Sequence, residues 1–450
     1  MRELLTMNAD DRDFLRTFFQ QLIDQPLDPD DPRYVPLHRE RRLDADDPVE
    51  LLARGIEWTP GQSVQLLSGF RGTGKSTELR RLRQRLQASG YLVVLCDIED
   101  YINLSTPVDV SDFLLALTGA IGDGLYEAGL LSRDPKREGY WERFRKYLTR
   151  THVEFPELGA QVSAVSIKMT LKSDPSFKEQ LQKRLAGHLG SFVQDIREYL
   201  KECVRYLKED DGVGKELVVL VDSVEHIRGT SVNAEQVHTS VETLFAGHAD
   251  KLHLPSIHTV YTVPPFVKVR YPNLGSLYEP GGIQILPAVK LRGDGDKQRN
   301  AAGFEVLAQV VQHRGDWERL LGSSERLDRI IAMSGGQFRD LLRILAEIAR
   351  RAAVLPVDDR TVDEAVSQIR NEFLPIADDD AQWLARIAET HSASPADVSQ
   401  LPDFARFLDT HLVLCYRNGH EWYDTHPLVA EHVTAQAEAL VKPSRGKKKR

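Results

Sequence analysis

Short apolar runs alternate with longer amphipathic segments along residues 8–291. Each run is bounded by glycine, proline or acidic residues, which is typical of buried strands. Short apolar strands that alternate with helices predict a parallel sheet covered on both faces, the α/β arrangement. The predicted strands are residues 63–69, 91–97, 216–221, 257–263 and 283–291.

The second and third predicted strands are separated by far more residues than one crossover connection needs. We therefore expect an insertion at about residues 125–212. Residues 165–172 alternate between apolar and polar side chains, as a half-exposed strand does. Asp174 and Pro175 then predict a helix start, and the apolar stripe behind them predicts one helix through Leu207. This helix packs on its own domain, which we favour, or binds a partner.

The segments that flank the sheet predict the remaining domains. An apolar stripe over residues 8–24 predicts a helix, and a Pro/Asp-rich linker follows it. Beyond the sheet we expect a helical lid, then a small domain with a hairpin at Asn418-Gly419. The predicted boundaries are 1–48 for the helix and linker, 49–292 for the core, 293–373 for the lid, 374–441 for a winged-helix-like domain and 442–450 for a basic disordered tail.

The composition is that of an ordinary globular protein, with 41% apolar and 28% charged residues in a chain of 450. No apolar run approaches the roughly 20 residues that span a bilayer. The first residues lack the apolar stretch of a signal peptide. The three cysteines are far apart and form no CxxC pair, which argues for a reducing compartment. We expect a cytoplasmic protein with no membrane contact.

The charge pattern restricts contact with nucleic acid. The net charge is −9, and residues 378–434 carry ten acidic side chains against three arginines. Phosphate contact requires the opposite sign. Residues 442–450 hold six basic groups, so nucleic acid is expected to bind only through this tail or through loops of the core.

A glycine-rich segment between a predicted strand and a predicted helix fits the pattern GxxxxGK[ST]. Glycines let backbone N–H groups converge on phosphate, and the following helix adds its positive end. Lys75 is expected to reach the β- and γ-phosphates, and the Ser76 hydroxyl to bind Mg²⁺. The predicted nucleotide-binding residues are Gly69, Arg71, Gly72, Thr73, Gly74, Lys75, Ser76 and Thr77.

A second acidic segment follows the strand at residues 216–221. Asp222 is the expected Mg²⁺ ligand, because a carboxylate after a buried strand can hold the ion that bridges the phosphates. Ser223 stands where many ATPases carry a glutamate, so Glu225 is the candidate for the base that activates water. A solvated surface glutamate is the alternative. No guanine-reading NKxD segment follows, which favours ATP over GTP.

The segment Ser334-Gly335-Gly336 precedes the predicted lid helix. It is similar to the ABC-transporter signature, but that signature precedes the Mg²⁺-binding strand and this segment follows it. We interpret it as the start of the lid helix. Arg339, in the first turn, is a candidate for γ-phosphate contact, with ordinary surface charge as the alternative. Surface charge is the favoured interpretation for Arg343.

Together these motifs resemble the AAA+/STAND superfamily of P-loop ATPases, particularly its Orc-like and signalling STAND branches, over about residues 50–440. The resemblance implies that Thr262, at the end of the fourth core strand, senses the γ-phosphate. It also implies an arginine finger, for which Arg270 and Arg292 are candidates and for which surface charge is the alternative. The missing Asp-Glu pair at Asp222 and Ser223 implies slow hydrolysis.

The expected function is an ATP- and Mg²⁺-dependent switch that hydrolyses ATP slowly, forms a homo-oligomer in the ATP state and controls a protein partner. The resemblance places such switches in bacterial signalling or anti-phage defence. One alternative is a DNA-loading or transposition-regulator ATPase. Another is an adaptor that binds ATP without hydrolysing it.

Overall fold

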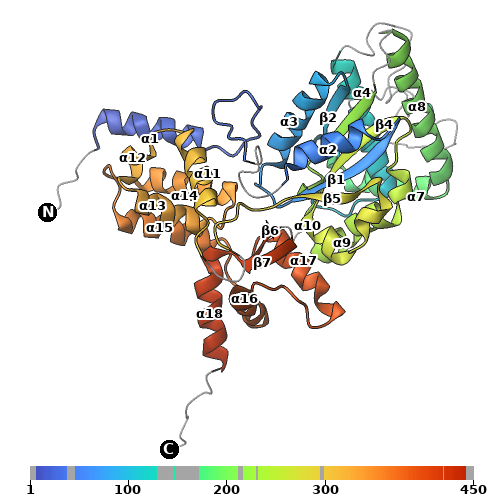
Figure 1. Ribbon diagram of the computed structural model, residues 1–450. Helices are drawn as coiled ribbons and strands as arrows, with labels where there is room; N and C mark the ends of the chain where they lie inside the picture. Colours follow the sequence, from blue (N-terminus) through green and yellow to red (C-terminus); the bar gives the residue numbers. More distant parts are fainter. Residues whose placement is uncertain are drawn as a thin grey trace, which may run out of the picture. The chain divides into compact units, whose positions relative to one another are not determined.

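The computed structural model describes residues 7–37, 46–128, 146, 172–210, 216–229, 232–293, 298–418 and 420–441. The chain divides into two compact units, whose elements are labelled in Figure 1. The sheet unit comprises residues 48–69 and 75–285, and the lid unit comprises residues 1–47, 70–74 and 286–450. Within the described ranges, no helix is both long enough and apolar enough to span a bilayer. The predictions for residues 165–171 and 442–450 lie outside these ranges.

A five-stranded sheet forms the centre of the sheet unit (Figure 1). Its strand order is β2-β3-β4-β1-β5, and β2–β3, β3–β4 and β4–β1 are parallel pairs. β1, β3 and β4 are buried along their whole length, as their continuous apolar runs predict. The strands are β1 (Ser63–Gly69), β2 (Leu92–Asp97), β3 (Leu217–Asp222), β4 (Ile257–Val263) and β5 (Pro280–Leu286).

Helices cover both faces of the sheet. The chain crosses from β1 to β2 and returns through β3 and β4 towards β5. Because crossovers are right-handed, the helix after β1 lies on one face and those after β2 and β3 lie on the other. α2 packs against α3, and α4 packs against α7 and α8, so the predicted three-layer fold is confirmed. The helices are α2 (Pro48–Glu57), α3 (Lys75–Ala88), α4 (Val110–Glu127), α7 (Pro175–Ala186), α8 (Leu189–Asp210), α9 (Ala234–Glu242) and α10 (Pro265–Arg270).

The single helix predicted from Pro175 through Leu207 is wrong, because α7 and α8 are separate helices. Gly187 lies at the break, and glycine costs about 1 kcal/mol relative to alanine inside a helix. The N–H of His188 donates to the carbonyl of Leu185 at 2.8 Å, a tight turn rather than a helical bond. The break does not remove the stripe from the interior, since both helices pack on α4.

The strand predicted at residues 283–291 is wrong at both ends: β5 begins at Pro280 and ends at Leu286. Pro287 follows and has no N–H group to continue a ladder. The next two residues pair within the lid unit instead. The N–H of Ala288 donates to Cys415 O at 3.2 Å, and the N–H of Val289 donates to Gly336 O at 3.0 Å.

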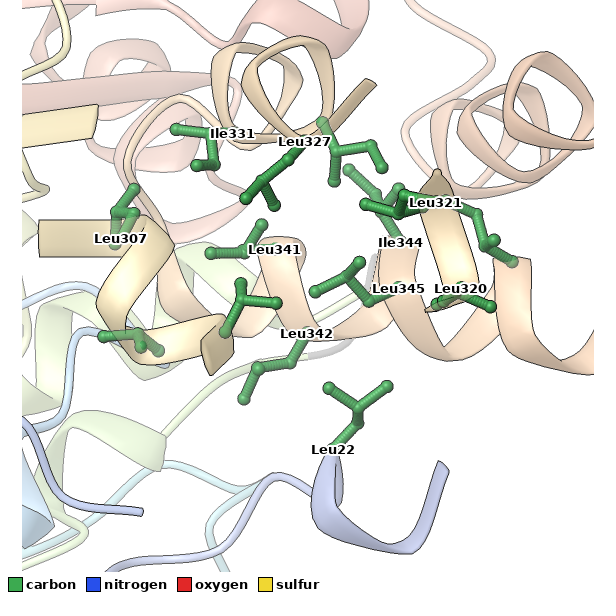
Figure 2. Packing of buried hydrophobic residues seen from close by; sticks show 14 of the residues in the cluster. Leu22, Leu307, Leu320, Leu321, Leu327, Ile331, Leu341, Leu342, Ile344 and Leu345 are labelled. Carbon is green, nitrogen blue, oxygen red and sulfur yellow. The ribbon is translucent and has the colours of Figure 1, made fainter. Parts of the chain in front are cut away.

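The lid unit is organised around one apolar cluster, part of which is drawn in Figure 2. The apolar face of α14, including Leu341 and Leu345, lies at its centre. Phe18 and Leu22, from α1 and the residue after it, are buried in the same cluster, so the N-terminal helix belongs to the lid's core. The helices are α1 (Ala9–Gln21), α11 (Ala301–Gln312), α12 (Trp317–Leu321), α13 (Ser324–Met333), α14 (Phe338–Arg351) and α15 (Asp359–Asn371).

The C-terminal elements are two helices, an antiparallel hairpin and a last helix, in that order, and a winged-helix-like domain stays a prediction. β6 and β7 form an antiparallel hairpin at the predicted place, with its tip, residue 419, outside the described ranges. Two buried hydrogen bonds join these elements to the start of α14: Tyr416 Oη donates to Gly335 O at 2.6 Å, and His426 Nε2 lies 3.2 Å from Asp340 Oδ2. The elements are α16 (Asp378–Thr390), α17 (Leu401–Asp409), β6 (Val413–Asn418), β7 (His420–Thr425) and α18 (Pro427–Val441).

Candidate functional site

The predicted phosphate-binding segment forms the loop between β1 and α3. Gly72 and Gly74 have φ angles of 80° and 93°, a left-handed region that glycine adopts without strain. The backbone N–H and the hydroxyl of Thr73 both bond to Phe70 O, at 3.3 and 2.8 Å. Arg71 lies in this loop, and Ser76 and Thr77 lie in the first turn of α3. The strand–loop–helix context required of a P-loop is therefore present.

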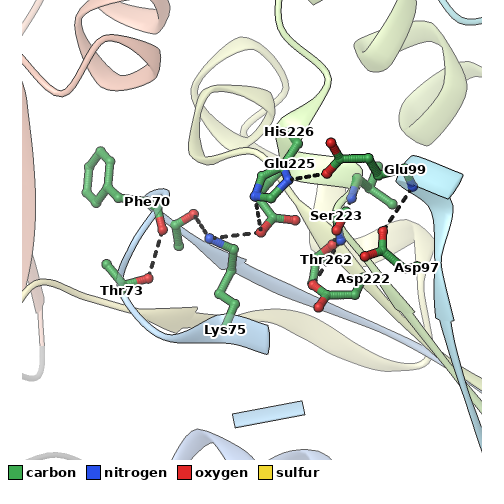
Figure 3. Close-up of polar contacts among 12 residues, drawn as sticks. Phe70, Thr73, Lys75, Asp97, Glu99, Asp222, Ser223, Glu225, His226 and Thr262 are labelled. Carbon is green, nitrogen blue, oxygen red and sulfur yellow. Dashed lines mark hydrogen bonds and ion pairs between the residues drawn. The ribbon is translucent and has the colours of Figure 1, made fainter. Parts of the chain in front are cut away.

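Lys75 begins α3 and is 3% exposed. Its Nζ donates to the carbonyl of Gly69 at 2.8 Å and lies 3.2 Å from Glu225 Oε1 (Figure 3). Both partners are acceptors, so the buried ammonium is held by groups that phosphate oxygens can replace. The structure thus brings together two residues that the sequence places 150 positions apart.

Asp222 is the last residue of β3 and is 6% exposed. Its Oδ1 accepts a 2.8 Å hydrogen bond from the N–H of Ser223, which has a left-handed φ of 67°. Its carboxylate also accepts a hydrogen bond from the Ser76 hydroxyl. Burial and the nearby Glu225 carboxylate raise the pKa of Asp222 to about 6, against the opposing effect of Ser76. The two residues predicted to bind Mg²⁺ are therefore in direct contact.

Glu225 lies in a short 3₁₀ turn, Val224–His226, directly after β3, and is 3% exposed. Burial raises its pKa, but the charges of Lys75 and His226 outweigh burial and hold the pKa below its usual range. Its Oε2 atom is buried and has no hydrogen-bond partner among the described residues. Glu225 is therefore an ionised carboxylate inside the sheet unit, rather than a solvated surface group.

Thr262 lies near the end of β4 and is fully buried. Its Oγ1 accepts a 3.2 Å hydrogen bond from the N–H of Val224. The hydroxyl thereby supports the turn that carries Glu225. The Thr262 side chain is also hydrogen-bonded to the Glu225 carboxylate, so a γ-phosphate contact for Thr262 stays a prediction.

The residues present fit Mg²⁺ bound together with a nucleotide. Among the described residues there is no group of three or more His, Cys, Asp or Glu side chains that could hold a metal alone. Mg²⁺ needs no such group, because it is usually held by one or two protein ligands, phosphate oxygens and water. The contact between the Ser76 hydroxyl and the Asp222 carboxylate supplies oxygen ligands of the right kind.

Arg339 lies in the first turn of α14, in the lid unit. A side chain added at Gly72, in the same unit, would collide with Arg339 Cβ, so this arginine packs directly against the glycine-rich loop. Its Nε donates to Asp24 Oδ2 at 2.5 Å, and the two side chains are 29% and 43% exposed. The guanidinium is thus paired with an anionic oxygen beside the loop.

The other candidate arginines are placed differently. Arg270 donates to Glu242 Oε2 at 2.8 Å and to both carboxylate oxygens of Glu235. Arg343 bonds to Asp340 and Glu372. Arg292 forms an isolated antiparallel bridge with Arg299 through the backbone. Arg270 and Arg343 are therefore paired with carboxylates of their own units.

Sequence reasoning missed Glu99, His226 and Asp24. Glu99 follows β2 and His226 follows β3, and these parallel strands are neighbours. Polar residues after adjacent parallel strands meet at one edge of a sheet, which is the signal that was available. Asp24 carried no such signal, because its pairing with Arg339 depends on the packing of α1 in the lid's core.

Comparisons with known proteins give a fold-level likeness only. A scan against protein-family models finds no match, and a search of curated proteins finds none either. Among solved structures, the Walker-type ATPase PABY2304 of Pyrococcus abyssi is 13% identical, with 92% of this chain and 99% of that chain covered and a TM-score of 0.41. The Aeropyrum pernix ORC2 protein in its ADP form is 14% identical, with coverages of 94% and 98% and a TM-score of 0.44.

A third solved structure, the Aeropyrum pernix ORC1 protein in complex with DNA, is 14% identical, with coverages of 94% and 97% and a TM-score of 0.37. Identities and scores at this level do not transfer an activity or a ligand to another chain. The chemistry of this site therefore depends on the chain's own residues: a glycine-rich loop, a buried lysine and two carboxylates at the end of β3.

Proposed function

We propose that this chain binds ATP with Mg²⁺, hydrolyses it slowly and acts as a nucleotide-dependent switch for a protein partner. The observation that carries the proposal is the buried ion pair between Lys75 and Glu225, at the end of a glycine loop with left-handed Gly72 and Gly74. A buried lysine paired with a carboxylate beside such a loop is suited to exchange that partner for a phosphate group.

Binding exchanges one set of acceptors for another. The Lys75 ammonium moves from Glu225 Oε1 and the Gly69 carbonyl to the β- and γ-phosphate oxygens, while backbone N–H groups of the loop donate to the phosphates. Ser76 and Asp222 would hold Mg²⁺, which neutralises charge on the phosphates when bound. Asp222 is ionised in this arrangement, because a cation beside a carboxylate lowers the pKa.

Hydrolysis depends on Glu225. Once Lys75 has turned to the phosphates, the Glu225 carboxylate has lost its ion-pair partner and its buried Oε2 has no competing hydrogen bond among the described residues. It then orients the attacking water and takes its proton. Ser223 stands where a second acidic residue would follow Asp222, which favours a slow reaction.

The switch depends on Arg339. Its contact with Gly72 and its pairing with Asp24 show a guanidinium next to the loop and already bound to an anionic oxygen. We infer that the γ-phosphate of ATP takes the place of Asp24, while ADP lacks the group required. The resulting change alters the oligomeric state and controls the partner. Bacterial signalling or anti-phage defence is proposed as the setting on resemblance to STAND ATPases alone.

The deciding experiment measures binding and phosphate release on the same preparation. Calorimetry with MgATP, MgADP and MgGTP tests binding and base preference, and phosphate release tests hydrolysis. Binding of MgATP with slow release of phosphate supports the proposal. Binding without release identifies an adaptor, and no binding removes the nucleotide assignment. Salt-dependent DNA binding by the full chain would instead support the DNA-loading alternative.

A further inference from the structure

His226 lies between two carboxylates of the sheet unit (Figure 3). Its Nδ1 is 3.1 Å from Glu99 Oε2, and its Nε2 is 3.8 Å from Glu225 Oε1. The side chains of Glu225, His226 and Glu99 are 2%, 22% and 52% exposed. The imidazole thus connects the buried carboxylate to one at the surface.

Glu99 fixes the orientation of this ring. An ionised carboxylate only accepts hydrogen bonds, so Nδ1 donates to Glu99 Oε2. Glu99 is itself held in the short turn Ile98–Asp100, where its N–H donates to Asp97 Oδ1 at 3.0 Å. With Nδ1 anchored in this way, Nε2 is directed at Glu225 (Figure 3).

Glu225 therefore has two basic neighbours, Lys75 and His226. A bound nucleotide would draw Lys75 away from Glu225 but would leave His226 in place. Lys75 is within 3.2 Å and belongs to the phosphate-binding segment, whereas His226 is part of the same turn as Glu225 and makes no contact with that segment that the described structure records. A buried carboxylate that loses Lys75 depends on the donors that remain, which are His226 and the Thr262 hydroxyl, because unpaired buried charge is costly.

We propose that His226, anchored by Glu99, is the positioning residue that holds Glu225 once Lys75 has transferred to phosphate; this inference rests on the proposed function. The 3.8 Å separation is too long for a hydrogen bond. A shift of about 1 Å brings Oε1 to the usual donor–acceptor distance from Nε2. Oε2, which has no partner among the described residues, is then left to orient the attacking water, and His226 acts on the reaction only through Glu225.

Substitutions at His226 separate its two contacts. In His226→Asn the amide nitrogen takes the place of Nδ1 and keeps the Glu99 contact, but the side chain at position 226 no longer reaches Glu225. In His226→Gln the amide nitrogen extends to the place of Nε2 and can still donate to Glu225. His226→Ala removes both contacts. His188→Ala, an exposed histidine of the same unit, is the matched control.

We expect His226→Ala and His226→Asn to lower kcat at least about tenfold, part of the roughly 10²–10⁴ that a positioned base supplies. KM and the Kd for MgATP should stay within about twofold of the control, since neither contact is to the nucleotide. His226→Gln should recover part of the loss. Glu99→Gln should lower kcat in the wild-type background but add nothing to His226→Ala, as residues of one network do.

Two outcomes overturn the inference: a kcat for His226→Ala equal to that of His188→Ala, or equal effects of Asn and Gln at position 226, which would indicate a general structural role. NMR of the His226 ring keeps the inference testable if wild type binds MgATP without turnover. With a non-hydrolysable analogue bound, Glu225→Gln should shift this resonance, and an unchanged resonance would mean that the two side chains do not meet. If the wild-type protein shows no turnover, the proposed hydrolysis is wrong. If the His226 resonance does not move, the proposed role of His226 is wrong.

Discussion

Lys75 Nζ lies 3.2 Å from Glu225 Oε1, and both side chains are only 2% exposed. In the free protein, each of these two charged groups therefore compensates the desolvation of the other. When a ligand draws Lys75 away, the buried Glu225 carboxylate needs other hydrogen-bond donors to offset the cost of its unpaired charge. The proposed binding of phosphate would therefore be linked to the state of the candidate base through this ion pair.

Substitution of Lys75 tests this link directly. Lys75→Ala should weaken ATP binding about tenfold or more, because charge-assisted hydrogen bonds of roughly 1.5–3 kcal/mol are lost. It should also lower the melting temperature of the free protein, since Glu225 is left buried without its partner. Calorimetry and thermal unfolding measure the two effects. Lys201→Ala, at an exposed position of α8, is the control; unchanged ATP affinity in Lys75→Ala would remove the P-loop assignment.

Substitutions of the two carboxylates at the end of β3, Asp222 and Glu225, should impair different steps. Glu225→Gln should still bind MgATP but lose at least about 10²-fold in turnover, the lower end of general-base contributions. Asp222→Asn should instead impair binding that depends on Mg²⁺, because its carboxylate is the expected ligand beside Ser76. Titrations with Mg²⁺ and phosphate release distinguish the variants. Wild-type turnover in Glu225→Gln would mean that another group activates the water or that none is needed.

Arg339 should distinguish ATP from ADP. One buried charge-assisted contact of roughly 1.5–3 kcal/mol shifts a two-state equilibrium about ten- to a hundredfold. We expect a non-hydrolysable ATP analogue, but not ADP, to change the hydrodynamic radius or oligomeric state, and Arg339→Ala to abolish the difference while ADP still binds. Light scattering of both proteins with both nucleotides decides this. Identical light-scattering profiles of the wild-type protein with the two nucleotides would contradict the switch and indicate a static ATP-binding adaptor.

The pairing of Asp24 with Arg339 predicts that substitution of Asp24 raises the affinity for the ATP analogue, by less than the change expected from Arg339→Ala. Asp24→Asn should raise the affinity for the analogue by at most about fivefold, because exposed ion pairs contribute roughly 0–1 kcal/mol. Affinity for ADP should not change, and the effect should vanish in an Arg339→Ala background. Calorimetry of the four proteins tests this, and equal gains for both nucleotides would mean that Asp24 does not compete with the γ-phosphate.

Asp112, buried at the start of α4, predicts a pH dependence of folding stability. Its pKa is raised to about 6, chiefly because burial disfavours its charge, against the attraction of Lys178. A raised folded-state pKa gives stability that is fully present below the unfolded value and is lost as pH rises through about 6. Relative to Asp112→Asn, wild type should therefore lose about 1 kcal/mol of unfolding free energy between pH 5 and pH 7. Denaturant unfolding at both pH values measures this, and a constant difference would contradict it.

The sequence was sufficient to predict the sheet and the loop of the site, because continuous apolar strands and a glycine-lysine motif are local signals. β1 and β4 begin and end where the pattern predicted. Other features depend on contacts that have no local signal. The chain after Pro287 pairs with the backbone of Cys415 and Gly336, more than a hundred and about fifty positions away, so the periodicity of residues 288–291 gave a false strand. The roles of Asp24, Glu99 and His226 likewise depend on which segments meet in space.

The two hydrogen bonds that join the C-terminal elements to the start of α14 affect how this protein can be shortened or recombined. Leu428 of α18 is part of the lid's apolar cluster, and His426 covers the buried carboxylate of Asp340. A protein that stopped at residue 377 would have a hole in the lid's interior, and the buried Asp340 would lose its contact with His426 and keep only that with Arg343. The C-terminal segment is therefore part of the lid's buried structure and cannot be exchanged freely for another domain. Its replacement by a segment from another protein would succeed only if the new segment brought partners for the Gly335 carbonyl and for Asp340.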